Sequence, residues 1–177
     1  KNGFQTTLIS GPTNLKIPDG VKAINVNSAI EMYERTIENL PVDVAVFGAA
    51  VADFKMKEIK SNKIKKENFE KLEIENNKDI LGNISKHNRL RPKIVIGFAA
   101  ETNNLDANAR KKLNEKNCDW IIANDVSNKQ IGFDSEYNEV KIFHKNKSNI
   151  QNILFNTKKM IAKTLVQKIS NELKANG

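Results

Sequence analysis

With 177 residues, the chain is long enough for one domain with a sizeable hydrophobic core and short for two ordinary domains. Its 29 Lys and Arg against 21 Asp and Glu give a net charge of +8, which admits an anionic partner: a nucleic acid, a phosphorylated metabolite or an acidic surface. One cysteine excludes an internal disulfide, and two histidines leave zinc-type ligand spacing poorly supported. Because no apolar stretch approaches the ~18 residues of a membrane span, we expect a soluble, cytoplasmic protein with no membrane partner.

Short apolar runs alternate with helical patterns along the chain, which predicts an α/β fold built on a doubly wound, mostly parallel sheet with helices on both faces. Ser28, with Glu31 three residues later, forms a capping box that begins a helix. In chain order we predict strands at residues 4–9, 22–26, 42–48, 93–98, 119–123 and 139–144, a shorter strand at 71–75, and helices at 28–39, 79–87, 104–117 and 153–174. Residues 1–177 are expected to form a single domain, in which the polar segment 55–71 is a mobile flap.

Small or polar residues directly follow four of the predicted strands. The segments are Ser10-Gly11-Pro12-Thr13, Ala49-Ala50-Val51-Ala52-Asp53-Phe54, Ala99-Ala100-Glu101-Thr102-Asn103-Asn104 and Asn124-Asp125-Val126-Ser127. Any tight turn after a strand would have a similar composition. Because ligands of doubly wound sheets bind outside the carboxyl ends of the strands, the four segments together favour a binding site there.

The second segment carries the most information. Ala49 and Ala50 are small enough to let backbone amides approach a ligand, and the carboxylate of Asp53 precedes a lysine cluster that includes Lys63 and Lys65. In an extended segment these two lysines lie on one side, as a phosphate clamp requires. The combination indicates a nucleotide site.

A second lysine pair lies on the predicted helix at 104–117. Lys112 and Lys116 are four residues apart and therefore project from one helix face, where an anionic ligand would relieve their mutual repulsion. A solvated lysine face is the alternative interpretation for both lysine groups.

These segments, in this order, resemble phosphopantothenoylcysteine synthetase, the phosphopantothenate–cysteine ligase family of coenzyme A biosynthesis. The resemblance rests on Gly48-Ala49-Ala50-Val51-Ala52-Asp53-Phe54, Lys63-Ile64-Lys65-Lys66, Gly97-Phe98-Ala99-Ala100-Glu101-Thr102 and Ala123-Asn124-Asp125-Val126-Ser127. With Ser10-Gly11-Pro12-Thr13 and Asn138-Glu139-Val140 it covers nearly the whole chain and is greatest to the bacterial, CTP-dependent form. It implies a Rossmann-like fold.

The resemblance implies a two-step ligation. The carboxylate of 4′-phosphopantothenate attacks the α-phosphate of CTP, with Mg²⁺ present, to give an acyl-cytidylate and pyrophosphate. The amine of L-cysteine then displaces CMP and forms the amide. Preorganised ammonium groups suit this chemistry because negative charge accumulates at the α-phosphorus and on the leaving group.

The resemblance also implies residue roles. Lys63 takes the catalytic role beside the phosphates, with Ala49, Ala50 and Asp53 forming one wall of the nucleotide site. The remaining nucleotide-binding residues that it implies are Asn77, Lys78, Asp79, Ile80, Phe98, Lys112 and Lys116. Lys78 stands where the family's Asn-Pro-Asp-Ile segment has proline. Metal ligands are left unassigned, because Mg²⁺ is held mostly by phosphates and water.

Several expectations concern the protein beyond this chain. In the bacterial form the ligase follows a flavin-dependent decarboxylase, so FMN belongs to that fused part, and a chain that begins at Lys1 without Met is expected to begin inside a longer parent. The family's N-terminal strand, Gly-rich turn and Ser-Ser-Gly-Lys loop precede the region that Lys1 matches, so the chain alone is expected to be an incomplete enzyme. The family pairs through its sheet region, which implies a homodimer within a larger oligomer, with residues 139–144 or 71–75 as the edge.

A basic, non-catalytic nucleic-acid-binding or assembly domain is the alternative function. Only 6% of the residues are aromatic, and the chain has neither an RNP-like aromatic motif nor a helix-turn-helix signature. Nucleic acid is therefore an unfavoured partner.

Overall fold

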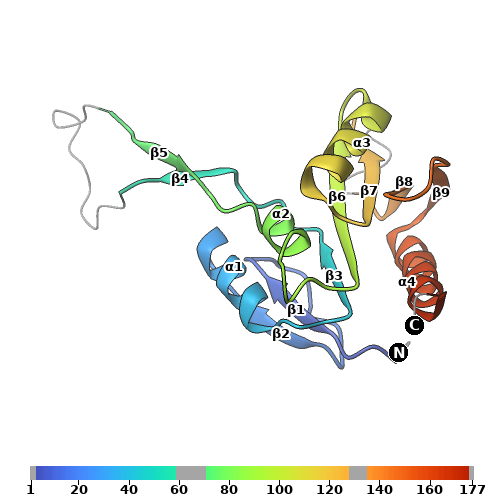
Figure 1. Cartoon of the computed structure of the whole chain (residues 1–177), viewed down its shortest axis with the longest axis horizontal. Coiled ribbons are helices and arrows are strands. Elements are labelled where there is room, and N and C mark those ends of the chain that lie inside the picture. The colour runs from blue at the N-terminus through green and yellow to red at the C-terminus, as the bar shows by residue number, and fades with distance from the viewer. Residues whose placement is uncertain (1–2, 59–70, 128–134, 176–177) are drawn as a thin grey trace. The chain divides into compact units, whose positions relative to one another are not determined.

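The computed structural model describes residues 3–58, 71–127 and 135–175, and Figure 1 traces them from the N-terminus to the C-terminus. The described residues belong to two compact units. The first unit lies within Lys1–Gln5, Asn39–Gly48 and Leu81–Gly177, and the second within Thr6–Glu38 and Ala49–Ile80. That residues 1–177 form a single domain stays a prediction.

The first unit is built on a five-stranded sheet. Its strands, in spatial order, are β3 (Val44–Phe47), β6 (Ile94–Glu101), β7 (Trp120–Asp125), β8 (Tyr137–His144) and β9 (Gln151–Thr157). β3, β6 and β7 are mutually parallel, whereas β8 and β9 add an antiparallel edge. The parallel pairs bring the carboxyl ends of β3, β6 and β7 to one edge of the sheet, as the sequence predicts.

Helices cover both faces of this sheet. They are α2 (Ile80–Ser85), α3 (Leu105–Lys116) and α4 (Lys158–Ala175). Along β6, Val95 and Ala99 pack with α3 residues in one buried cluster, while Ile94 and Ile96 pack with α4 residues in the other. This alternation is the period of two expected for a strand buried on both sides, and it confirms the prediction of helices on both faces.

The predicted helix at 153–174 is wrong in its first part. Residues up to Thr157 form β9, which pairs antiparallel with β8, and α4 begins only at Lys158. Ile153 is half-buried and Leu154 is exposed, which is the alternation of a strand at the edge of a sheet. The helix begins there because the Thr157 hydroxyl accepts a hydrogen bond from the Met160 amide at 3.2 Å, as an N-cap does.

Other boundaries also differ from the prediction. β6 continues to Glu101 and β7 to Asp125, so these residues lie in strands rather than in turns. They continue because their backbones stay paired, with Glu101 in register with Asp125. The helix predicted at 104–117 is confirmed as α3, with left-handed Asn104 and Asn117 at its two ends.

The second unit contains two small sheets and one helix. β1 (Thr7–Ser10) and β2 (Lys22–Asn25) are parallel, α1 spans Ala29–Glu38, and β4 (Phe54–Met56) pairs antiparallel with β5 (Ile74–Asn76). The capping interaction is confirmed: the Glu31 amide donates to the Ser28 hydroxyl at 3.2 Å, and the Glu31 carboxylate accepts from the Asn27 amide at 2.7 Å. β4 was not predicted, because it falls at the edge of the segment interpreted as a flap.

Candidate functional site

The predicted site residues divide among three parts of the chain. Ala49, Ala50, Asp53 and the run 77–80 belong to the second unit, and Phe98, Lys112 and Lys116 belong to the first. The predicted catalytic residue, Lys63, lies outside the described residues. The structure therefore gives the geometry of each half of the predicted site, and the complete site stays a prediction.

In the second unit, Asn77 holds the segment that follows Ala50. Its side-chain amide donates to the carbonyl of Ala52 at 2.9 Å and to that of Phe54 at 3.3 Å, and its backbone amide donates to the carbonyl of Asp53 at 2.7 Å. Three hydrogen bonds thus fix the backbone on both sides of Asp53. The structure therefore brings together two predicted residues, Asn77 and Asp53, and gives Asn77 a part in shaping the predicted wall.

Lys78 has a partner within its own unit. Its ammonium lies 4.3 Å from the centroid of the Tyr33 ring on α1, an interaction worth about 0.5–1 kcal/mol at an exposed position. This contact links the start of α2 to α1 through the Lys78 side chain. Asp79 then precedes α2 directly, and Ile80, its first residue, is buried.

The strands β4 and β5 form a two-stranded ribbon, and lysine and glutamate side chains in and beside these strands form ion pairs. Lys55 pairs with Glu75 at 3.0 Å, and Glu73 accepts from both Lys71 at 2.8 Å and Lys57 at 3.2 Å. The hydrogen bonds from Lys71 and Lys57 hold the pKa of the Glu73 carboxyl below its usual value, and the bond from Lys71 has the larger effect. Residues 59–70, which include Lys63, connect the two strands along the chain.

In the first unit, Lys112 and Phe98 are in direct contact. The Lys112 Nζ donates to the Phe98 carbonyl at 2.7 Å, which joins α3 to β6. The Phe98 ring lies beside Gly48, where an added Cβ would be 3.7 Å from the ring atom Cδ2. Phe98 and Lys112, which were predicted from separate motifs, are therefore neighbours. The contact joins the Lys112 side chain to the Phe98 backbone.

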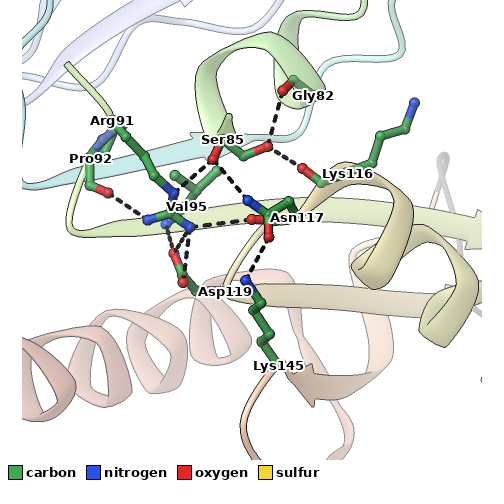
Figure 2. Close-up of polar contacts among 9 residues, drawn as sticks. All are labelled: Gly82, Ser85, Arg91, Pro92, Val95, Lys116, Asn117, Asp119 and Lys145. Atoms are coloured by element: carbon green, nitrogen blue, oxygen red, sulfur yellow. Dashed lines mark hydrogen bonds and ion pairs between the residues drawn. The ribbon is translucent and has the colours of Figure 1, made fainter. Parts of the chain in front are cut away.

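Lys116, one turn further along α3, plays a different part. Its carbonyl accepts a short hydrogen bond from the Ser85 hydroxyl, while its side chain points away from the polar residues around it (Figure 2). The backbone of Lys116 thus belongs to the packing of α3 against α2.

Sequence reasoning did not find a polar cluster around Arg91. The Arg91 guanidinium donates to both Asp119 oxygens, at 3.0 and 2.9 Å, and its Nε donates to the Ser85 carbonyl at 2.8 Å (Figure 2). Asp119 also accepts from the Val95 amide at 2.7 Å. Because Val95 lies near the start of β6 and Asp119 precedes β7, the cluster joins the amino ends of these strands, away from the predicted ligand edge.

Asn117 extends this cluster to the end of α3. It adopts the left-handed conformation with φ 57°, its carbonyl accepts from Arg91 at 3.3 Å, and its side-chain oxygen accepts from Lys145 at 2.6 Å. Asparagine tolerates this conformation better than most residues, so it ends the helix here. An Asn directly after a helical pattern is the sequence signal that would have indicated this cap.

The carboxylates at the opposite ends of β6 and β7 are bonded within the chain. Glu101 accepts from the Asn108 side chain at 2.9 Å, and Asp125 accepts from the amide and hydroxyl of Ser127 at 2.8 and 2.6 Å. The Ser127 hydrogen bonds lower the pKa of the Asp125 carboxyl. Within residues 3–58, 71–127 and 135–175, no group of three or more His, Cys, Asp and Glu is arranged to hold a metal ion.

Cys118 lies two residues before the start of β7 and is completely buried. Burial raises the pKa of its thiol to about 11, with smaller effects from neighbouring charges. The thiol is therefore protonated at neutral pH. It acts as a small apolar residue of the core and is no candidate for a nucleophile.

The parallel strands β3, β6 and β7, the helices on both sheet faces and the small residues after the strands define a Rossmann-like α/β fold. Among the described helices, none combines the length and apolar character needed to cross a bilayer. The chain belongs to the family described as the DNA/pantothenate metabolism flavoprotein C-terminal domain, which matches residues 1–173. The family expected from the motifs is thus confirmed.

Curated relatives support this assignment. The coenzyme A biosynthesis bifunctional protein CoaBC of Borreliella burgdorferi is 40% identical over 171 residues, which are 94% of this chain and 42% of the relative. The protein of the same name from Haemophilus influenzae is 42% identical over 148 residues, which are 82% of this chain and 36% of the relative. The chain thus spans less than half the length of these relatives.

Solved structures agree on the fold. The crystal structure of the C-terminal domain of coenzyme A biosynthesis bifunctional protein CoaBC has a TM-score of 0.75 and 33% identity, over 96% of this chain and 74% of that one. The DNA/pantothenate metabolism flavoprotein from Streptococcus pneumoniae has a TM-score of 0.74 at 21% identity, over 96% and 82%. The second comparison supports the fold alone.

Proposed function

We propose that this chain is the ligase part of a bifunctional protein of coenzyme A biosynthesis, which joins 4′-phosphopantothenate to L-cysteine with CTP as co-substrate. The observation that carries the proposal is the 40% identity to a protein named for coenzyme A biosynthesis over nearly the whole chain. The ordered motifs from Gly48 to Ser127 supply the link to this reaction. In this proposal FMN serves the decarboxylase part of the bifunctional protein.

The proposed reaction has two steps. A carboxylate oxygen of 4′-phosphopantothenate attacks the α-phosphorus of CTP, and the bond to the pyrophosphate oxygen breaks, which leaves an acyl-cytidylate and pyrophosphate. The cysteine amine then attacks the acyl carbon, loses a proton and displaces CMP. Lys63 is the residue proposed to stabilise the charge that develops at the α-phosphate, because an ammonium group placed there favours the transition state over the ground state.

The described residues offer no preformed cage for Mg²⁺. Mg²⁺ keeps several waters and binds nucleotide phosphates with one or two carboxylates, so a cluster of protein ligands is not required. In this proposal the ion accompanies CTP and neutralises part of the phosphate charge. Asp53, whose backbone Asn77 holds, is the carboxylate of the proposed wall.

We further propose a homodimer. Of the two predicted edges, 139–144 is wrong, because β8 lies between β7 and β9 and both of its sides are paired. The outer strand β9 has no charged residue, its Leu154 and Phe155 are 71% and 53% exposed, and Phe155 stacks on Tyr137 with 5.1 Å between centroids. Edge strands of monomers usually carry charges that prevent pairing with another chain. β9 is therefore a better candidate for the dimer edge than residues 71–75, which carry Lys71, Glu73 and Glu75.

The dimer has a direct test by light scattering of the purified full-length protein. We expect Leu154→Lys to lower the apparent mass, with Ile74→Lys on the β4–β5 ribbon as the comparison. If the ribbon variant alone lowers the mass, the dimer forms through the ribbon. A monomeric parent protein would contradict the dimer.

The ligase activity is tested with the full-length protein, 4′-phosphopantothenate, L-cysteine and CTP. We expect release of CMP that requires both 4′-phosphopantothenate and L-cysteine, and release of pyrophosphate that requires 4′-phosphopantothenate, with a preference for CTP over ATP. Binding of random oligonucleotides that weakens with added salt, without any CMP release, would instead support the nucleic-acid-binding alternative.

A further inference from the structure

We propose that the amino-terminal edge of the first unit's sheet is a second binding surface, which holds the phosphate backbone of a double-stranded nucleic acid without reading its bases. Five exposed cations form this surface, which we call the basic edge: Lys86, Arg89, Lys93, Lys145 and Lys147. It lies at the end of the sheet opposite the carboxyl ends of β3, β6 and β7, and the inference does not depend on the proposed function.

The sheet topology brings the basic edge together from separate parts of the chain. β6 and β7 are parallel, whereas β8 is antiparallel to β7, so the carboxyl end of β8 lies beside the amino end of β7. The loop 86–93, which leads into β6, and the segment 145–149, which follows β8, therefore lie at the same edge. Asn117 joins them, because its carbonyl accepts from Arg91 at 3.3 Å and its side-chain oxygen accepts from Lys145 at 2.6 Å (Figure 2).

Cations outnumber carboxylates along the basic edge. The segments 86–93 and 145–149 contain no Asp or Glu. Together with Arg91 and Arg110 the edge carries seven cations, and their carboxylate partners among the described residues are Asp43, Asp119 and Glu172. Seven positive and three negative charges leave +4, which is half of the net charge of the chain. Such a concentration of positive charge is typical of a surface that binds nucleic acid.

Hydrogen bonds fix the backbone that carries these cations. In the loop 86–93, the His87 imidazole accepts from two backbone amides of its own turn, at 3.3 and 3.1 Å. After β8, the Arg110 guanidinium donates to three backbone carbonyls between residues 144 and 148, at 3.4, 3.2 and 2.5 Å. Cations on a fixed backbone lose less conformational entropy when they bind phosphates than cations on a free segment do.

The basic edge lacks the apolar centre that is usual in protein interfaces. None of the exposed large hydrophobic residues in the described part of the chain lies within 86–93 or 145–149. Two aromatic residues at this edge, Trp120 and Phe143, are buried. A protein partner would require apolar contacts, and a single strand would require exposed aromatic rings for its bases, whereas a duplex backbone requires only cations. The composition of the edge therefore favours a duplex.

Nucleic acid is unfavoured by the sequence motifs because the chain has neither an RNP-like aromatic motif nor a helix-turn-helix signature. Those motifs stack on bases or read their edges. Contacts with phosphates need neither, and they carry no sequence information. The basic edge therefore predicts binding that weakens with added salt and is indifferent to base sequence.

The test is a titration of the full-length protein with duplexes of DNA and of RNA, each of mixed sequence and about 20 base pairs long, between about 50 and 200 mM salt. The edge variant combines Lys86→Gln with Arg89→Gln, and Lys145→Gln changes the other segment independently. The matched control combines Lys159→Gln with Lys163→Gln, two exposed lysines of α4. The edge and control variants therefore have the same net charge.

We expect the parent to bind both duplexes with a dissociation constant of about 10⁻⁴–10⁻⁶ M at physiological salt, the usual range for binding without sequence preference. For DNA, the plot of log affinity against log salt becomes shallower by about 1.8 in the edge variant and by about 0.9 in Lys145→Gln, since each lost phosphate contact contributes about 0.9. The control keeps the slope of the parent. Tighter binding of one duplex supports the proposal and identifies DNA or RNA as the source of the phosphates.

The inference is overturned if the parent binds neither duplex, or if the edge and control variants change the slope equally. Poly-L-glutamate that binds as tightly as DNA at equal charge concentration would assign the edge to an acidic protein segment instead. Inhibition of CMP release by the duplex would place the nucleic acid at the proposed nucleotide edge, against this assignment. Because the duplex titration needs no CTP, failure of the proposed ligase activity leaves its result intact.

Discussion

Arg91 and Asp119 form a two-pronged ion pair, in which one guanidinium nitrogen lies 3.0 and 2.9 Å from the two carboxylate oxygens. Both side chains are largely buried, with 27% and 29% of their surfaces exposed. The pair holds β6 to β7 at their amino ends, since Asp119 also binds the amide of Val95.

We expect Arg91→Met to lower the free energy of unfolding by about 2 kcal/mol, because it removes the guanidinium hydrogen bonds to the Asp119 carboxylate and to the Ser85 carbonyl. Urea denaturation measures this change. The control is Lys93→Met, whose pair with Asp43 is 69% and 67% exposed and should contribute about 0.5 kcal/mol or less. Equal effects of the two substitutions would contradict the importance given to the Arg91 cluster.

The buried position of His144 predicts that the free energy of unfolding decreases in acid. It is buried against Trp120, with 4.7 Å between the ring centroids, and neither ring nitrogen has a hydrogen-bond partner among the described residues. Burial, followed by the charge of Lys147, lowers the pKa of the imidazole; Lys168 adds to this effect, and Glu172 and the nearby Gln151 side chain oppose it.

The sign of the pH dependence follows from this direction. The unfolded chain binds a proton at about pH 6.5, and the folded protein only at lower pH. The stability contributed by neutral His144 is complete above about pH 6.5 and is lost as the pH falls below it towards the folded-state value. We expect His144→Phe to flatten the acid limb of a curve of unfolding free energy against pH, and an unchanged limb would contradict this account.

Gly97→Ala is expected to destabilise the first unit by about 1–3 kcal/mol through overpacking. A Cβ at this position would lie 2.6 Å from Leu81 Cδ2 and 2.9 Å from Ile121 Cδ1, both in the closely packed cluster under α3. Gly11→Ala is the matched control, because a Cβ there meets nothing within 4 Å. Thermal unfolding of both variants measures the difference, and similar midpoints would show that Leu81 can move aside without cost.

Lys63→Gln is expected to lower the turnover of the full-length protein in the ligation assay at least ~100-fold, the cost of removing one donor to the transition state. Lys111→Gln serves as the control for the loss of one positive charge and should leave turnover unchanged. A Lys63→Gln protein with the turnover of the parent would remove Lys63 from the proposed mechanism.

The periodic parts of the fold were predictable from the sequence. α1 and α3 were predicted within a residue or two, because the Ser28 cap and the helical patterns are local features of the sequence. β9 was not, because Ile153 and Leu154 suit a strand or a helix equally well over so short a run. Pairing with β8, a contact distant from the helical pattern that follows, decided between the two.

The same division applies to the candidate site. The sequence by itself determined the family, the order of the motifs and the residues to consider, because small residues and charges near strand ends are local features. Only the tertiary structure decided that Asn77 holds the backbone around Asp53 and that Lys112 binds the Phe98 carbonyl rather than standing alone on its helix. β3 ends in register with Gly97, whereas β6 continues to Glu101, and this difference is a property of strand pairing. Because β3 ends first, the Phe98 carbonyl is available to a lysine from α3.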